Sequence, residues 1–226
     1  MEERGIYVGK AVITGGGTGL GRALAHRYAK EGYEIVLLGR TEKKLSMVRM
    51  EIIQQGGQAE SYICDVTEPA SVAEAVRQLD RIDILINNAG IGIFGELSTL
   101  KEEDIDKMLD TNIKGTILMT QKAFPLLKVS EGRVLNIIST AGLRGKVNES
   151  VYCASKFAVR GFTESLQKEW EDQPMSATAV YMGGMNTPFW SDSDHVADPS
   201  RLKGPEGVAD KIFAEDDRRK EIKVDS

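Results

Sequence analysis

Short apolar runs rich in β-branched residues recur along the chain, and longer stretches with helical spacing lie between them. The apolar runs predict strands at 11–14, 34–38, 59–63, 84–87, 133–139, 177–181 and 221–224. The stretches between them predict helices at 20–30, 42–55, 69–78, 102–127, 152–170 and 206–214. This alternation is typical of βαβ units, which build a parallel sheet through right-handed crossovers.

Several of the predicted strands are apolar at every position, as expected where helices cover both faces of a sheet. The pattern therefore predicts an α/β fold, a doubly wound Rossmann domain with about seven parallel strands and helices on both faces. A chain of 226 residues is long enough for one such core, so we expect residues 1–226 to form a single domain. Ligands of these folds bind outside the carboxyl ends of the strands.

A glycine-rich segment, TGGGTGLG at 14–21, joins the first predicted strand to the first predicted helix. Glycine permits a tight turn and lets the backbone approach a pyrophosphate, while the helix N-terminus offers free N–H groups. A glycine cluster alone is more often a simple turn, but a cluster between a strand and a helix indicates a dinucleotide site. The spacing differs from the commoner Gly-x-Gly-x-x-Gly fingerprint.

A second motif lies in STAGLRGKVNESVYCASK, which contains Ser139, Tyr152 and Lys156. On a helix, a spacing of four residues places the phenol and the ammonium on one face. The ammonium favours the ionised phenol and lowers its pKa. Lowering that pKa from about 10 to near neutrality requires about 4 kcal/mol, which is more than one cation typically supplies, so a second positive group is needed. An oxidised nicotinamide ring would be one. The pair alone is weak evidence, because roughly one such spacing is expected by chance in a chain of this composition.

Together these motifs resemble those of the short-chain dehydrogenase/reductase family, whose glycine motif is Thr-Gly-x-x-x-Gly-x-Gly. The resemblance extends from about residue 10 to about residue 189 and includes further pieces in matching order. These are Asn87-Asn88-Ala89-Gly90, Asn112, Ser139 and Tyr152-x-x-x-Lys156. Each piece is modest, but the ordered set is specific.

The resemblance assigns the catalytic roles. It implies that Tyr152 is the general acid/base and that Ser139 holds the substrate oxygen. It implies that Lys156 binds the nicotinamide ribose and lowers the pKa of Tyr152. Asn112 is expected to support a water that links Lys156 to solvent. This logic agrees with the chemistry, because carbonyl reduction develops negative charge on oxygen that positioned donors stabilise.

The resemblance also implies a set of cofactor-binding residues. They are Gly15, Gly17, Thr18, Gly19, Leu20, Gly21, Arg40, Asp65, Val66, Asn88, Ala89, Gly90, Tyr152, Lys156, Gly183 and Thr187. Asp65 is expected to accept a hydrogen bond from the adenine amino group, or to cap the helix that follows. Thr187 fits the carboxamide contact, whereas Met182 replaces the proline usual before Gly183.

The second predicted strand ends at Gly39-Arg40, where NAD-preferring members usually carry an aspartate. An acidic group there would repel a 2′-phosphate, whereas a guanidinium binds one bidentately. Thr41, Lys43 and Lys44 add a hydroxyl and positive charge. The alternative is that Arg40 is a solvated loop residue that binds no phosphate. The residues at this strand end predict that the protein prefers NADP(H) to NAD(H).

The overall composition gives no reason to expect nucleic acid or an anionic membrane as partner, since the net charge is −5. Cys64 and Cys153 are too few for a disulfide framework or a zinc cluster, and His26 and His195 do not make a metal site. No apolar run approaches transmembrane length and the N-terminus lacks a secretory apolar region, so a cytoplasmic protein is expected.

The segment 186–203 is the variable stretch that covers the substrate in the family. Phe189 and Trp190 there indicate either a pocket wall or ordinary packing, and the two alternatives stay open. Leu143, Arg144 and Lys146 are expected at the pocket entrance. Relatives assemble through the helices at 102–127 and 152–170, which predicts a homodimer or homotetramer, and the last strand is expected at a sheet edge.

The sequence thus predicts an NADP(H)-dependent oxidoreductase that interconverts a carbonyl compound and a secondary alcohol. The competing class is an NADP-binding regulatory or scaffolding protein of the same fold. The complete set of Asn112, Ser139, Tyr152 and Lys156 favours the enzyme, and the short C-terminal region disfavours an epimerase or dehydratase. Neither the substrate nor the direction of the reaction can be read from the sequence.

Overall fold

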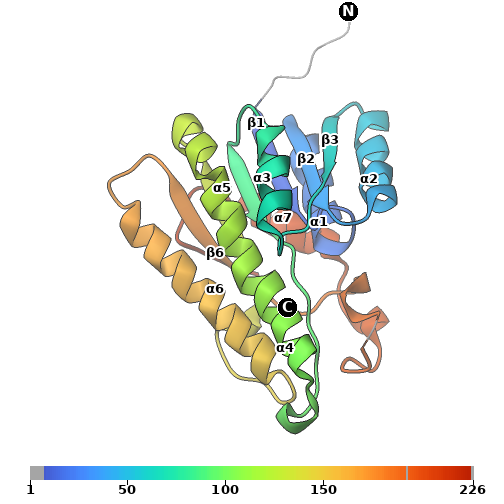
Figure 1. The fold of residues 1–226 in the computed structure, drawn as a ribbon. Helices are drawn as coiled ribbons and strands as arrows, with labels where there is room; N and C mark the ends of the chain where they lie inside the picture. Colours follow the sequence, from blue (N-terminus) through green and yellow to red (C-terminus); the bar gives the residue numbers. More distant parts are fainter. Residues whose placement is uncertain (1–7, 192, 225–226) are drawn as a thin grey trace, which may run out of the picture.

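The computed structural model describes residues 8–191 and 193–224, and these form seven parallel strands in one sheet (Figure 1). The strand order is β3-β2-β1-β4-β5-β6-β7. The strands are β1 (Gly9–Thr14), β2 (Tyr33–Gly39), β3 (Gln58–Ile63), β4 (Ile84–Asn87), β5 (Arg133–Ile137), β6 (Ser176–Met182) and β7 (Glu221–Val224). The order reverses between β1 and β4, which defines a doubly wound sheet, and β7 lies at one edge as expected from the sequence.

Helices cover both faces of the sheet. One face packs on α1 (Gly19–Lys30), α2 (Glu42–Gln54) and α7 (Pro205–Ala214), and the other on α3 (Pro69–Arg77), α5 (Gly115–Ser130) and α6 (Ser150–Glu169). Alternate residues of β1 divide between the two layers, since Ala11 and Ile13 face α1 whereas Val12 faces the opposite layer. The predicted α/β fold is therefore confirmed, and every position of β1 is buried because both faces are covered.

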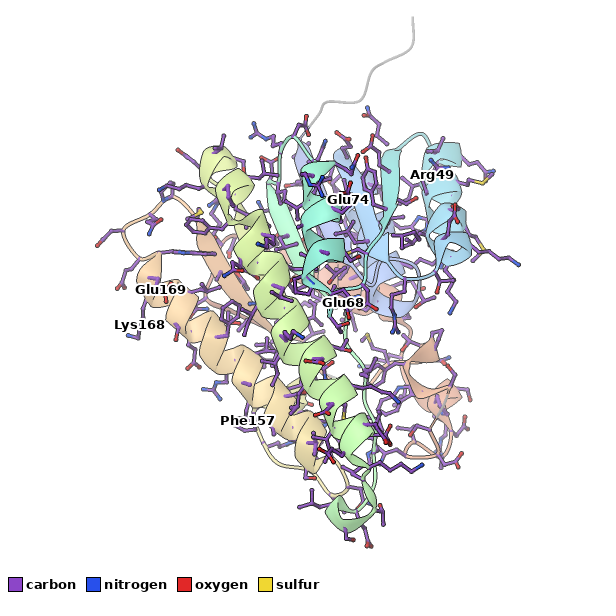
Figure 2. The ribbon with its side chains drawn as sticks, in the orientation of Figure 1. Arg49, Glu68, Glu74, Phe157, Lys168 and Glu169 are labelled. Atoms are coloured by element: carbon purple, nitrogen blue, oxygen red, sulfur yellow. The ribbon has the colours of Figure 1, made fainter. Side chains whose placement is uncertain are left out.

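The outer surfaces of these helices are largely polar, although α2 exposes Met47, Met50 and Ile53. Figure 2 shows Arg49 on α2 and Glu74 on α3, both of which are exposed. Phe157 on α6 is also exposed, at 42% of its surface. Isolated apolar side chains at the surface are ordinary in folded proteins.

Two predicted elements differ in detail from the structure, and both differences lie at the predicted site. The predicted helix at 102–127 begins as α4 (Glu102–Leu109), passes through a π-helical turn at Asp110–Lys114 and continues as α5. The strand predicted at 133–139 ends at Ile137, and Ser139 beyond it has a φ of 86°. A π-turn widens the backbone, and a positive φ re-aims a side chain, so neither follows from apolar periodicity.

A buried ion pair ties the C-terminal segment to the amino ends of the strands. Arg133 at the start of β5 donates from Nε and Nη2 to the two carboxylate oxygens of Asp216, at 2.6 and 2.8 Å. Tyr28 of α1 donates its hydroxyl to the same carboxylate at 2.6 Å. The segment after α7 is thereby fixed to the first crossover, at the end of the sheet opposite the glycine loop.

Candidate active site

The glycine loop after β1 forms a cradle that side chains would fill. Gly15 and Gly19 have φ values of 65° and 52°, a region that favours glycine. A Cβ atom on Gly21 would lie 2.3 Å from the carbonyl oxygen of Gly15. The loop therefore requires glycine for its conformation at two positions and for close packing at the third, and its backbone stays open to a ligand at the N-terminus of α1.

The loop after β4 is bonded to the glycine loop through polar side chains. Thr14 Oγ1 accepts hydrogen bonds from the backbone N–H groups of Asn88 and Ala89, each at 3.0 Å. The Asn88 side-chain amide donates to the carbonyl oxygens of Thr14 and Gly15, at 3.0 and 3.3 Å. These hydrogen bonds join the loop after β1 to the loop after β4 at the carboxyl edge of the sheet, where the strand order reverses.

A continuous cavity of about 1050 Å³ runs along this edge. It is lined by every predicted catalytic and cofactor-binding residue except Gly21 and Asn112, which lie behind its wall. Arg40, Asp65 and Val66 lie at its wall, as does Lys44, whereas Lys43 is not among the lining residues. The fold therefore brings together residues that are up to about 170 positions apart, as parallel topology predicts.

The Asp65 carboxylate has a local partner in the structure. Its Oδ1 accepts hydrogen bonds from the N–H and the hydroxyl of Thr67, at 3.0 and 2.8 Å. The N-cap position of α3 is Glu68, without a side-chain capping bond, so the helix-capping alternative for Asp65 is wrong. The carboxylate instead closes a turn, and its second oxygen accepts no hydrogen bond within the described residues. The neighbouring Cys64 is a buried thiol whose pKa burial raises to about 11.

Tyr152 and Ser139 meet at the floor of the cavity. Tyr152 lies in the first turn of α6 and is buried, which raises the pKa of its phenol well above the ordinary value. A hydrogen bond with Ser139 acts in the opposite direction, and the charge of Glu149 raises the pKa further. The Ser139 hydroxyl oxygen also accepts from the N–H of Ala141 at 3.3 Å. The two hydroxyls are positioned to bind one substrate oxygen.

Lys156 lies one helical turn after Tyr152, as the spacing predicts, and its ammonium is 5.7 Å from the centre of the phenol ring. Its Nζ donates to the carbonyl oxygen of Ile137 at 3.0 Å. Burial lowers the pKa of Lys156 to about 8, and no acidic side chain contributes to that shift. The lysine is thus a buried cation held by a carbonyl group beside the tyrosine.

Asn112 occupies the π-helical turn and is buried behind Lys156. Its side-chain oxygen accepts from the N–H of Ile91 at 2.8 Å, and its amide donates to the Ile91 carbonyl and to Ser155 Oγ. A Cβ on Gly90 would lie 3.2 Å from Asn112 Oδ1 and 3.5 Å from Lys156 Nζ. Asn112 therefore fixes the loop after β4 against α6, with its side-chain groups fully engaged.

On the far side of the cavity, the segment after β6 approaches the glycine loop. Met182, Gly183 and Thr187 all line the cavity, and Thr187 Cβ lies 3.2 Å from the position of a Cβ on Gly19. Met182 is buried in the layer beneath α1 and α7. The position usually held by proline is thus filled by a packed side chain, which keeps the strand end in place.

Phe189 and Trp190 both line the cavity, which agrees with the pocket-wall alternative for them. Phe94, Glu149 and His195 lie there as well, although the sequence pattern did not select them as site residues. Of the three residues expected at the entrance, Lys146 lines the cavity, whereas Leu143 and Arg144 do not. No local motif marks Phe94 or Glu149, since each reaches the site only through tertiary packing.

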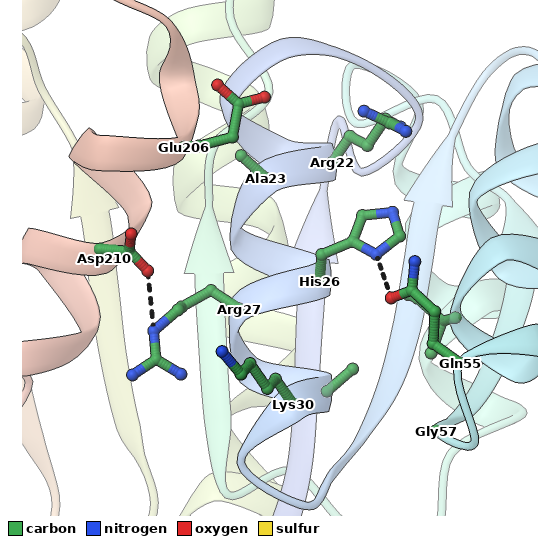
Figure 3. Close-up of a pocket in the computed structure, with 11 residues that line it drawn as sticks. Arg22, Ala23, His26, Arg27, Lys30, Gln55, Gly57, Glu206 and Asp210 are labelled. Atoms are coloured by element: carbon green, nitrogen blue, oxygen red, sulfur yellow. Dashed lines mark hydrogen bonds and ion pairs between the residues drawn. The ribbon is translucent and has the colours of Figure 1, made fainter.

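A second, smaller pocket of about 410 Å³ lies between α1, α2 and α7, away from this site (Figure 3). Figure 3 shows Arg27 paired with Asp210 and His26 bonded to Gln55. Arg22 and His26 also contact Glu51, each at 3.0 Å. Arg22 and Arg27 in this pocket are thus already paired with carboxylates.

Within 8–191 and 193–224, no group of three or more His, Cys, Asp or Glu side chains is arranged to hold a metal ion. No described helix combines the length and the apolar character that crossing a membrane requires.

Fold and site together define a doubly wound α/β protein with a dinucleotide-type loop and a Ser-Tyr-Lys centre. Residues 9–197 match the family model described as short chain dehydrogenase, and the chain belongs to that family of oxidoreductases. It is 34% identical over 195 residues to a sepiapterin reductase of Chlorobaculum tepidum, covering 81% of this chain and 80% of the relative.

Two solved structures illustrate the likeness of the fold. A metagenomic short-chain oxidoreductase in complex with NADP has 28% identity and a TM-score of 0.83, with 98% of each chain covered. A short chain dehydrogenase/reductase from Burkholderia phymatum in complex with NAD has 24% identity and a TM-score of 0.87, covering 97% of this chain and 89% of its own. The second likeness concerns the fold alone.

Proposed function

We propose that the protein is an NADP(H)-dependent oxidoreductase that interconverts a carbonyl compound and a secondary alcohol. The observation that carries the proposal is the meeting of Ser139, Tyr152 and Lys156 at the floor of a cavity that continues to the glycine loop. The family's oxidoreductase activity supports it. In this proposal, residues 1–226 form one domain that acts on a small molecule. The protein is a homodimer or homotetramer in the cytoplasm.

The residues present fit a dinucleotide. Glycines stand where a Cβ would fill the cradle or strain the backbone, and the N-terminus of α1 faces the loop. Asp65 retains a carboxylate oxygen for the adenine, and Asn88, Ala89 and Gly90 lie along the cavity wall. A bound NADPH supplies a hydride to the substrate carbon. The solved metagenomic relative, which is in complex with NADP, supports this choice of cofactor.

Side chains of the protein itself carry out the proton transfer. Tyr152 donates its phenolic proton to the substrate oxygen, and Ser139 binds the same oxygen through its hydroxyl. Lys156, whose ammonium lies 5.7 Å from the centre of the phenol ring, stabilises the phenolate when it is protonated and binds the ribose. Asn112 holds the loop at Ile91 against α6 and so keeps Lys156 in place. In the reverse reaction, Tyr152 accepts the proton from the alcohol.

The choice between NADPH and NADH rests on Arg40, which lines the cavity at the end of β2, where an acidic residue would favour NAD. A charge-assisted hydrogen bond to a phosphate contributes about 1.5–3 kcal/mol. Titrations followed by fluorescence should therefore show NADPH binding about tenfold to a hundredfold more tightly than NADH. Arg40→Ala should erase that preference, whereas Lys43→Ala, at a residue outside the cavity wall, should preserve it. Equal affinity of the unchanged protein for both cofactors would refute the NADP(H) assignment.

The catalytic assignment has its own test. Tyr152→Phe should reduce carbonyl turnover by about a hundredfold to ten-thousandfold, which is the scale of general acid catalysis, while NADPH still binds. Tyr62→Phe, at a tyrosine whose hydroxyl contacts Glu60 away from the cavity, is the matched control and should retain activity. If the protein binds neither cofactor, the enzyme proposal fails and a regulatory or scaffolding role takes its place.

A further inference from the structure

Aromatic rings surround Tyr152 on the substrate side of the cavity. The ring of Phe94 packs edge-to-face on Tyr152 with centroids 5.4 Å apart, and Phe189 lies 6.0 Å from it. Trp190 is stacked near Phe94 at 5.5 Å and meets Phe189 edge-to-face at 5.0 Å. All four rings line the cavity and form its aromatic wall around Tyr152.

His195 completes this group of rings. Its imidazole stacks on Phe94 with a centroid distance of 4.5 Å and an angle of 21°, and it is nearly parallel to Trp190. The Trp190 indole N–H donates to the Met185 carbonyl oxygen at 2.9 Å, which fixes that ring in turn. The contacts join the loop after β4 to the segment at 189–195 across the mouth of the cavity.

The plane of His195 is set by a buried carboxylate. Its Nε2 is 3.0 Å from Oε1 of Glu149, which is 7% exposed and precedes Tyr152 by three residues. The other carboxylate oxygen of Glu149 is 3.7 Å from Lys146 Nζ, so both oxygens have partners. The pair therefore holds the imidazole ring against Phe94 and within the cavity wall.

We propose that His195 is a specificity-determining residue and Glu149 its positioning residue, and that together they select flat aromatic carbonyl substrates. This inference rests on the proposed carbonyl reduction and deepens it by naming the substrate class. Aromatic rings attract one another in offset-stacked and edge-to-face arrangements beyond the gain from buried area. A saturated ring of similar size buries comparable area but lacks that attraction, so the wall of rings discriminates between the two.

A matched pair of ketones tests the selection. Acetophenone and cyclohexyl methyl ketone have the same carbon skeleton but a flat and a puckered ring. Their kcat/KM values with NADPH, and their dissociation constants from the protein–NADP⁺ complex by calorimetry, give two selectivity ratios. Loss of one aromatic contact is expected to reduce each ratio about three- to tenfold in His195→Ala. His195→Phe, which keeps a ring, should retain most of the preference.

Further variants separate positioning from chemistry. Glu149→Ala should lower the ratios as His195→Ala does, whereas Glu149→Gln keeps an acceptor for the imidazole and should restore them. A general effect of the Glu149 charge on Tyr152 cancels from the ratios, because both ketones share the same proton transfer. His26→Ala removes a His–Glu contact of the same 3.0 Å length, on α1, and should leave the ratios unchanged.

The outcomes distinguish the inference from the proposed function. An equal fall in activity towards both ketones in His195→Ala overturns the inference and leaves carbonyl reduction standing. The same holds if the dissociation constants of the unchanged protein already favour the puckered ketone, because binding does not depend on the lower intrinsic reactivity of an aryl ketone. Selective binding of acetophenone without any NADPH-dependent turnover supports the aromatic pocket and refutes the proposed function. Both the inference and the proposed function are supported if the unchanged protein prefers acetophenone, if this selectivity ratio falls in His195→Ala, and if it is higher in Glu149→Gln than in Glu149→Ala.

Discussion

Replacing the buried Lys156 by methionine should stabilise the ligand-free protein while removing its activity. Lys156 is 6% exposed, and burial lowers its pKa from 10.5 to about 8. This lowering of the pKa corresponds to about 3 kcal/mol of unfavourable burial at neutral pH. Methionine also loses the hydrogen bond to Ile137, at a cost of about 1 kcal/mol. The net expectation is about 2 kcal/mol of added stability near pH 7.

The sign of the pH dependence follows from proton uptake. Below about pH 8 Lys156 is charged in both states, and the folded protein carries the full penalty. Between about 8 and 10.5 the folded state has lost this proton whereas the unfolded state keeps it, so stability rises with pH. The advantage of Lys156→Met should therefore be largest near neutrality and vanish above about pH 10.5.

Urea denaturation without cofactor, followed by fluorescence at neutral pH and at about pH 10, measures the effect. Lys10→Met is the matched control, because Lys10 is also 6% exposed but contacts Asp80 at 2.5 Å and Glu34 at 3.3 Å. Burial lowers the pKa of Lys10, but those two acids raise it more, so its charge stabilises the fold and Lys10→Met should destabilise it. Destabilisation of comparable size by both substitutions at neutral pH would refute the reasoning for Lys156.

Three further outcomes are expected from the structure. Gly21→Ala places a Cβ 2.3 Å from the Gly15 carbonyl oxygen and should abolish NADPH binding in titrations; normal affinity would contradict the proposed cradle. Asp216→Ala leaves the largely buried Arg133 without its carboxylate and should cost about 3–5 kcal/mol of stability in urea unfolding, and a loss below about 1 kcal/mol would show that water replaces it. Cys64, with a pKa raised to about 11, should resist iodoacetamide at neutral pH until the protein unfolds, as mass spectrometry of the labelled protein can check.

The fold and the glycine loop at the carboxyl edge of the sheet could be predicted from the sequence because their signals are local. Strands, crossovers and the glycine loop depend on short patterns, and parallel topology then brings their carboxyl ends together. Asp65 shows the limit of such signals. Its identity fits both a helix cap and a cofactor contact, and only the bond to Thr67 excludes the cap.

The substrate side could not be predicted because its geometry depends on contacts between distant segments. Phe94 follows β4 and His195 follows β6, yet their rings are stacked. Ser139 was expected in a strand but has a positive φ, which apolar periodicity does not reveal. The influence of Lys156 on Tyr152 was also expected from spacing alone, whereas in the ligand-free protein burial dominates the pKa values of both groups.

The bond between Tyr28 and Asp216 joins residues 188 positions apart, and α7 packs on α1 across nearly the same separation. During synthesis, therefore, the layer beneath α1 stays incomplete until residues 205–216 have left the ribosome. The ion pair of Arg133 also forms late, because its partner Asp216 lies 83 residues further along the chain. Contacts of this range slow folding because the chain must close long loops before they form. The packing of α7 on the first crossover is therefore expected to form late in folding.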